Sequence, residues 1–375
     1  MKRWMILFVL LCLLPGAAFA QSLQQSAQEM IGTLDLNVLD EMADTLLESD
    51  AKTLLMRMIK GETVLTAQEV WQRLLAQAAG VFQKSIWRMT RLMIPALLVA
   101  AAEWLHAGKN IAGDAARYAG MIMTMTLLVS DLREHTELAT QTVDHMANSM
   151  QAIFPVMVTL LAAVGGTASS AFYQPAVIGA AGAMTTLVHQ VTMPLAVSMA
   201  VLTMVGGLSE GLRLSRMCRL FRQAAGWTLG LGFTIFVGVM TVQGVNMAAL
   251  DGVSIRTAKY AIDHIVPIVG GMFSDTVDTL VGCSLIVHNA VGLLGLLVLL
   301  STLLLPLIRT ALTMFLYRAA AALIQPLSDH PLCRAIGGYA DVFSLLFIIQ
   351  LSVGAMFFLL VAQLITVADL TVMLR

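Results

Sequence analysis

Apolar residues dominate the chain from about residue 86 to its end, in blocks that short polar stretches separate. Eight of these blocks predict membrane-spanning helices. A ninth block, at 305–324, carries Pro306, Arg309 and Arg318, and it is compatible with a further span, a kinked continuation of the preceding helix or an interfacial helix. The chain is therefore expected to hold about seven to nine spans. The eight blocks are residues 92–105, 115–129, 153–166, 175–190, 191–208, 226–245, 285–305 and 339–362.

The first 20 residues have the layout of a secretory signal peptide. Lys2 and Arg3 precede an apolar run at 4–14, and a small-residue cleavage site follows at 18–20. The apolar run is shorter than the roughly 18 residues that a span needs. This favours cleavage of residues 1–20 over an uncleaved first span.

Residues 21–85 are more polar, with acidic residues in excess over basic ones. Thr66 and Glu69 fit a capping box, the pattern that opens a helix. We expect a small extracytoplasmic helical region that packs on a partner or on the bilayer surface, because its apolar content is too low for a large core of its own. A solvated helical leader without a specific partner is the alternative. The first group of transmembrane helices then occupies residues 86–242.

Residues 243–284 are the one long stretch within the apolar part that polar side chains mark at regular intervals. Apolar residues recur there every three or four positions with charged residues on the opposite side, which is the period of an amphipathic helix. Gly270 and Gly271 interrupt the pattern, and a second amphipathic stretch follows. We predict two short helices that lie at the membrane surface or re-enter the membrane, before the C-terminal transmembrane helices at 285–375.

The same segment carries the candidate functional residues. In one hypothesis its glycines permit a re-entrant structure whose polar faces line an aqueous path or a subunit contact, because irregular backbone at membrane depth is tolerated only there. The alternative is a solvated face of two interfacial helices, in which Lys259 and Asp263 pair along one side. The candidate channel-lining or subunit-contact residues are Asp251, Arg256, Lys259, Asp263, Gly270, Gly271, Asp275 and Asp278.

Four arginines recur at every third position in the loop at 209–223. Positive charge in a short loop indicates the cytoplasmic side, so this loop is predicted inside and the acidic stretch at 131–148 outside. On a helix the arginines spread into a broad band. The band is interpreted as a topology determinant in contact with anionic lipid, or as a docking surface for a cytoplasmic partner such as an ATPase. The four are Arg213, Arg216, Arg219 and Arg222.

Composition agrees with an all-α, polytopic integral membrane protein. Hydrophobic residues make up 58% of the chain and charged residues 12%, with a mean hydropathy of +0.82. Soluble domains carry roughly 25% charged residues, so that class is excluded. The formal net charge of −1, without any Lys/Arg block, gives no indication of nucleic-acid binding.

The sequence contains no signature of an enzyme. Phosphate-binding, zinc-protease and serine-hydrolase motifs are missing, and neither the seven histidines nor the cysteines are spaced as metal ligands. We expect no catalysis, no cofactor and no metal. Ionisable residues within the spans are few, mainly Glu103, His106 and His189, and their places near span ends favour interfacial anchoring over a proton relay.

Several motifs of the chain recur together in a known family. Residues 251–293 read DGVSIRTAKYAIDHIVPIVGGMFSDTVDTLVGCSLIVHNAVGL, residues 154–175 read FPVMVTLLAAVGGTASSAFYQP, and residues 320–329 read AAALIQPLSD. In order and spacing these resemble the stage III sporulation protein AE family of endospore-forming bacteria, which shows DGVTIRTAK, a Pro-Val-Val-Gly turn, MF[ST]D and a KNAVGL-like end. The signal-like start and the basic loop fit the same pattern. One departure is His288, where the family pattern has lysine.

The resemblance implies a biological role. Family members belong to the channel complex that joins the mother cell to the engulfed forespore. The chain is thus expected to be a multi-pass subunit of this channel or secretion-like apparatus in the mother-cell membrane, needed for endospore formation and late forespore gene expression. The implied partners are other membrane proteins of the stage III sporulation A-operon, a cytoplasmic ATPase of the complex and, indirectly, a forespore channel partner. A stand-alone permease for a small solute or ion, and a passive membrane scaffold, are the alternatives.

Overall fold

The computed structural model describes residues 51–60, 67–105, 111–208, 214–265, 269–326 and 331–374. These residues form helices joined by short turns, and no strand occurs among them. The predicted signal peptide lies outside the described residues. The helices are α3 (Ala51–Ile59), α4 (Ala67–Leu105), α5 (Ile111–Ala163), α6 (Thr167–Leu187), the π-helical turn η1 (Val188–Thr192), α7 (Met193–Leu208), α8 (Ser215–Ile265), α9 (Val269–Ile324) and α10 (Pro331–Met373).

The start of α4 follows the sequence pattern. The helix begins at Ala67, directly after Thr66, so the helix start predicted from the capping box is confirmed. It then continues without a break past residue 85, where the extracytoplasmic region was expected to give way to transmembrane helices.

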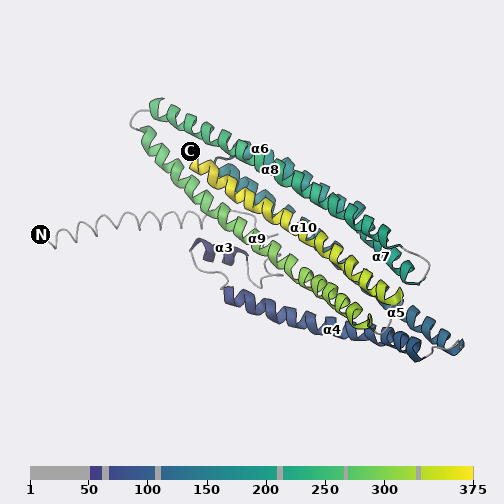
Figure 1. Ribbon diagram of the computed structural model, residues 1–375. Coiled ribbons are helices and arrows are strands. Elements are labelled where there is room, and N and C mark those ends of the chain that lie inside the picture. The colour runs from purple at the N-terminus through teal and green to yellow at the C-terminus, as the bar shows by residue number, and fades with distance from the viewer. Residues whose placement is uncertain are drawn as a thin grey trace.

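The long helices lie side by side in an elongated bundle (Figure 1). α6, η1 and α7 follow one another without a gap and form one rod. Successive rods run in opposite directions. The α7–α8 and α9–α10 connections therefore share one end of the bundle, the α7–α8 end. The α5–α6 turn, the α8–α9 connection and the end of α10 share the other, the α8–α9 end (Figure 1).

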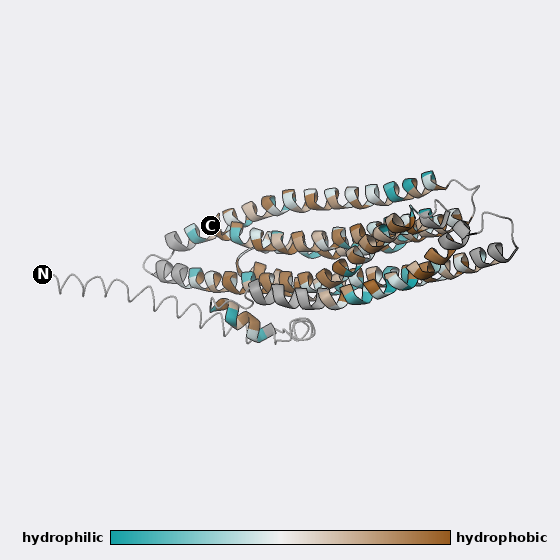
Figure 2. Ribbon diagram, turned by 60° about the horizontal axis from the view of Figure 1, so that its bottom comes forward, coloured by the Kyte–Doolittle hydropathy of each residue, from teal (hydrophilic) through white to brown (hydrophobic). Residues whose placement is uncertain are grey.

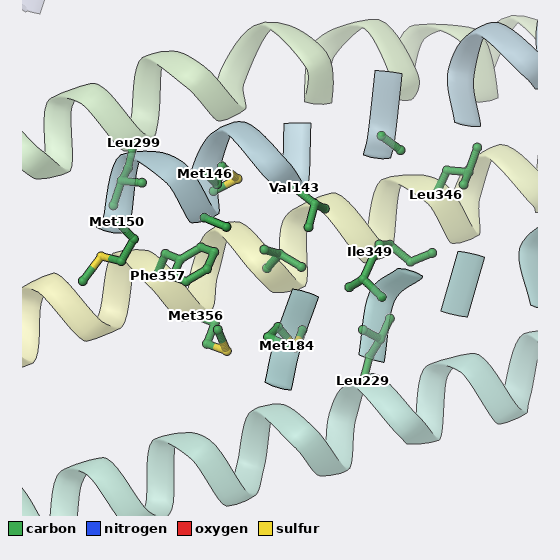
Figure 3. Packing of buried hydrophobic residues seen from close by; sticks show 14 of the residues in the cluster. Val143, Met146, Met150, Met184, Leu229, Leu299, Leu346, Ile349, Met356 and Phe357 are labelled. Atoms are coloured by element: carbon green, nitrogen blue, oxygen red, sulfur yellow. The ribbon is translucent and has the colours of Figure 1, made fainter. Parts of the chain in front are cut away.

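The core of the bundle forms around α10, which contacts α5, α7, α8 and α9. Met146 and Met150 from α5, Leu299 from α9 and Met184 from α6 gather around Phe357 of α10, and all five are buried (Figure 3). Within a bilayer, helices gain little from the hydrophobic effect, because lipid tails are as apolar as their side chains. Close van der Waals packing of this kind is what holds the rods together.

Five segments of the described residues are long and apolar enough to cross a membrane. The expectation from sequence was seven to nine. Part of the difference arises because predicted blocks share helices, and one further block, 92–105, lies in α4, which is not among the five. Blocks 115–129 and 153–166 both lie in α5, 175–190 and 191–208 in the α6–η1–α7 rod, and 285–305 and 305–324 in α9. The five candidate spans are Tyr118–Ala163, Thr167–Leu208, Ser215–Ala261, Thr276–Ile324 and Arg334–Met373.

The rods are longer than a bilayer is thick. α9 has 56 residues, which span about 84 Å at 1.5 Å per residue, against a hydrocarbon core of roughly 30 Å. Pro306 lies inside α9 without ending it, so 305–324 continues the preceding helix. Rods of this length project beyond the hydrocarbon core, and charged residues far from their centres need not face lipid.

One face of α8 is apolar and uncovered by the rest of the described chain. Trp227, Ile235 and Val242 are exposed on it, and a Cβ added at Gly226 or Gly238 would meet nothing within 4 Å. Figure 2 shows hydrophobic positions dominating the middle turns of the long helices. Such a face suits contact with lipid tails.

Candidate functional site

The two arms of the α8–α9 hairpin carry the predicted channel-lining or subunit-contact residues. Asp251, Arg256, Lys259 and Asp263 lie on the last turns of α8, and Gly270, Gly271, Asp275 and Asp278 on the first turns of α9. The predicted amphipathic pair thus consists of the ends of two long helices. α8 ends at Ile265 and α9 begins at Val269, so the two glycines that were expected to interrupt the pattern lie within α9. The re-entrant structure stays a prediction.

Lys259 and Asp278 come together across this hairpin, 19 residues apart in sequence. Lys259 Nζ donates to Asp278 Oδ1 over 2.5 Å. Because both groups are partly exposed, the pair contributes about 1 kcal/mol or less. Arg256 is exposed on α8, one turn before Lys259. The side chains of Asp263 and Asp275 lie outside the described part.

Asp251 is separate from this pair and buried, with only 1% of its surface exposed. Its Oδ1 accepts a hydrogen bond from the amide of Ala168 at 2.7 Å, and its Oδ2 accepts one from the amide of Ser169 at 2.9 Å. Both amides belong to the first turn of α6, whose N–H groups have no partner within the helix. Asp251 therefore caps α6 from a different helix, and its negative charge faces the positive end of the α6 dipole.

The turn from α5 to α6 is shaped to meet this part of α8. Gly165 has φ of 104°, a conformation that favours glycine. A Cβ at Gly165 would come within 2.6 Å of the Ile255 side chain. Gly252 is packed just as closely against Leu374, near the end of the chain. Two sequence motifs that lie about 80 residues apart, at 154–175 and from 251 onward, thus meet at Asp251.

A second link joins α9 to α10 near the same end. Asn289 Nδ2 donates to Asp369 Oδ1 at 3.0 Å. The preceding residue, His288, is fully buried, and its Nδ1 lies 3.4 Å from Asn289 Oδ1.

A network that the sequence did not reveal lies toward the α7–α8 end. Glu134 of α5 accepts hydrogen bonds from Arg88 of α4 at 2.7 Å and from Arg309 of α9. One helical turn before Glu134, Asp131 accepts a hydrogen bond from Tyr317 of α9 at 2.5 Å. The stretch 131–148, predicted to lie outside between two spans, is instead the middle of α5. The segment stays helical because its carboxylates find hydrogen-bond partners on neighbouring helices.

The charge of Arg88 is secured by this network. Partial burial by itself lowers the pKa of Arg88, but the hydrogen bond and the negative charge of Glu134 outweigh burial, so the pKa lies above its ordinary value. Arg88 is therefore cationic at every physiological pH.

Replacing Glu134 with glutamine is expected to destabilise the protein by about 1–2 kcal/mol, since Arg88 and Arg309 would then face each other without a carboxylate. Thermal unfolding of the purified protein in detergent measures the change. Glu137→Gln, one turn further along α5 and exposed, is the matched control and should have little effect. Equal unfolding temperatures for the two variants would contradict the network's role.

His189 has a partner that its sequence position did not indicate. It lies in η1, and its Nε2 is 2.8 Å from Asp144 Oδ1 on α5. π-helical turns inside α-helices are uncommon and frequently mark functional positions. His189, predicted from the sequence as an interfacial anchor, thus links the α6–η1–α7 rod to α5. The π-helical turn orients its side chain toward α5.

The predicted arginine band is divided by its contacts. Arg216 and Arg219 are exposed, whereas Arg222 donates to Asp341 Oδ1 at 3.0 Å and to Ser344 Oγ at 3.3 Å. Arg318 of α9 approaches the same carboxylate at 3.6 Å. Arg213 lies outside the described residues. The starts of α8 and α10 and the end of α9 are therefore held together by Asp341.

No group of three or more His, Cys, Asp or Glu side chains is placed to hold a metal ion within the part of the chain that the structure describes. The polar sites above consist instead of pairs and small networks that join one helix to another. These contacts have one effect in common, which is to hold neighbouring rods in position.

Comparison with known proteins supplies two matches. A family model described as "Stage III sporulation protein AE" matches residues 49–368. The protein named "Stage III sporulation protein AE" from Bacillus subtilis (strain 168) is 29% identical over 368 residues, which cover 95% of this chain and 92% of that protein. No solved structure matches.

Proposed function

Because the chain belongs to the stage III sporulation protein AE family, we propose that it is a membrane-embedded subunit of the channel or secretion-like complex that connects the mother cell with the forespore. In this role it is required for endospore formation and for late gene expression in the forespore. The observation that carries the proposal is the family match over 49–368, which contains all five candidate spans apart from the last turns of α10.

The distribution of charge supports one orientation in the mother-cell membrane. Arg216, Arg219, Arg222, Arg318 and Arg334 all lie at the α7–α8 end, and an excess of arginine in short loops is typical of the cytoplasmic side. The α8–α9 end, with the Lys259–Asp278 pair, then faces the space between the two membranes. A signal peptide cleaved after residue 20 would start the mature chain on that same side.

This orientation is tested with single cysteines in a background that lacks Cys218, Cys283 and Cys333. Cysteines at Met217, near the start of α8, and at Val253, near its end, are both at exposed positions. A membrane-impermeant thiol reagent added to intact protoplasts is expected to label the cysteine at 253 and to spare the one at 217. The reverse pattern would overturn the orientation.

The partners implied by the proposal are the other stage III sporulation A-operon proteins, a cytoplasmic ATPase of the complex and, across the intermembrane space, a forespore protein. Charged side chains on the hairpin arms are suited to subunit contact because they are accessible at the end of the bundle. Arg256→Glu is expected to abolish complex formation without loss of protein, as measured by co-purification from sporulating cells. If the variant still co-purified with the complex, the subunit contact would not involve Arg256.

The biological role is tested by deleting the gene in the native host and counting heat-resistant spores. Nearly complete loss, with rescue by the wild-type gene, is expected. A normal spore count would refute the proposal. Transport by the purified protein alone, reconstituted in vesicles, would instead favour the stand-alone permease. Normal sporulation of the deletion strain carrying the Arg256→Glu gene would favour a scaffold in which the hairpin charges are dispensable.

A further inference from the structure

A cavity of about 660 Å³ opens at the α7–α8 end, between the last turns of α7 and the first turns of α8 and α10. Arg219, Arg222 and Arg334 line its polar side, and Met199 and Leu202 line part of its apolar side. Volumes of a few hundred Å³ are typical of pockets that hold small ligands. The combination of arginines with an apolar wall suits an amphiphilic anion.

The arginines of the cavity are not all committed to protein partners. Arg222 is held by Asp341 and Ser344, at 3.0 and 3.3 Å. Arg219 and Arg334 are exposed and have no hydrogen bond or ion pair with other described residues. Among the described residues that line the cavity, Asp341 is the one carboxylate, and Arg318 approaches it as well. Two cations thus remain available to a ligand.

The cavity wall also includes the N-terminal turns of two helices. Ser215 begins α8, and Arg334 and Ala335 lie in the first turns of α10. Unpaired N–H groups at helix starts carry partial positive charge and favour anions. Together with Arg219 and Arg334, they give the cavity wall a positive character that favours an anion.

The cavity lies at one end of the bundle, at the ends of several rods. Three candidate spans, Thr167–Leu208, Ser215–Ala261 and Arg334–Met373, begin or end beside it. The arginines lie at the ends of these candidate spans, and Met199 and Leu202 of the apolar wall lie further along α7, toward its middle. Gly338 helps to shape this wall, because a Cβ there would overlap Thr203 of α7.

We propose that this cavity binds the headgroup of an anionic phospholipid. Arg219 and Arg334 hold the phosphate, Arg222 and Asp341 fix the floor of the site, and the acyl chains lie along Met199 and Leu202 toward the bilayer. Basic residues near a membrane surface attract anionic lipid by about 1 kcal/mol per charge, and a preformed cavity adds position to that attraction. The inference goes beyond the sporulation role and rests only on membrane insertion.

The test uses the purified full-length protein in neutral detergent. Short-chain phosphatidylglycerol, phosphatidylcholine or inorganic phosphate is titrated, and the rise in unfolding temperature gives the apparent affinity. Phosphatidylglycerol is expected to stabilise the wild type, and the double variant Arg219→Gln/Arg334→Gln is expected to bind it about tenfold or more weakly. Both side chains are exposed, so their replacement leaves packing unchanged, which equal unfolding temperatures without lipid would verify.

Arg216→Gln is the matched control, because Arg216 is exposed on the same turn of α8 as Arg219 but does not line the cavity. It should retain the wild-type affinity. An equal loss in the control, or equal stabilisation by phosphatidylcholine, would overturn the site. If inorganic phosphate stabilised the protein and phosphatidylglycerol did not, the cavity would be a site for soluble phosphate. The proposal of a lipid site would then be wrong. Because binding is measured on purified protein, failure here is distinct from failure of the sporulation role.

Discussion

Replacing Asp251 with alanine is expected to destabilise the protein by about 3 kcal/mol. The carboxylate is almost completely buried and satisfies two backbone amides at the start of α6. Without it, the buried amide of Ser169 and the half-buried amide of Ala168 lose their acceptor. An unpaired buried donor costs about 1–3 kcal/mol, and the half-buried one costs less. The unfolding temperature of the purified protein in detergent should fall by several degrees, with lower accumulation in sporulating cells.

Two further aspartate variants separate the cap from a general effect of charge. Asp251→Asn keeps one acceptor oxygen but turns an NH₂ group toward a backbone N–H, so an intermediate loss is expected. Asp278→Ala removes the exposed end of the Lys259 pair and should change stability by about 1 kcal/mol or less. If Asp251→Ala unfolded at the wild-type temperature, α6 would not depend on a cap from α8.

The helical class of the chain could be predicted from composition and apolar blocks, but the number of rods could not. When spans are predicted from apolar blocks, each span ends where charged residues begin, as at 131–148. In the bundle those charges face Arg88, Arg309 and Tyr317, contributed by helices far away in sequence. Because the partners satisfy them, α5 continues through the polar stretch, and two predicted blocks become one helix.

The amphipathic pattern at 243–284 could be read from the sequence, but the partners of its side chains could not. The amphipathic pattern identified the ends of α8 and α9 and included Asp251, Lys259 and Asp278. Local spacing suggested a pair between Lys259 and Asp263, which stays a prediction because the side chain of Asp263 lies outside the described part. The structure adds a pair between Lys259 and Asp278 across the hairpin, 19 residues apart. The role of Asp251 was hidden for the same reason, since its partners at 168 and 169 belong to another motif.

The arginines at 216, 219 and 222 differ in burial and in contacts, which their spacing in the sequence does not indicate. In the sequence, Arg216, Arg219 and Arg222 look equivalent at their three-residue spacing. In the bundle, Arg222 bonds Asp341, Arg219 lines the cavity and Arg216 does neither. The approach of α10 to α8 creates these differences, and that approach depends on residues more than 100 positions away.

Replacing Gly244 with alanine is expected to destabilise the protein by about 2 kcal/mol, through overpacking. A Cβ at Gly244 would overlap the hydroxyl of Tyr173 on α6 and lie 3.3 Å from Val367 on α10. Tyr173 is completely buried, and its aromatic ring is rigid. Three rods meet at this glycine, so their separation must increase. Thermal unfolding in detergent measures the loss.

Gly238→Ala on the same helix is the matched control, because a Cβ there meets nothing within 4 Å. It should leave stability unchanged or raise it by up to about 1 kcal/mol, as alanine favours helix over glycine. Tyr173→Phe supplies the decisive cross-check. It removes the oxygen that the new Cβ would strike, so Gly244→Ala should cost less in that background than in the wild type. Additive effects of the two substitutions would mean that α6 and α8 do not approach each other through this contact.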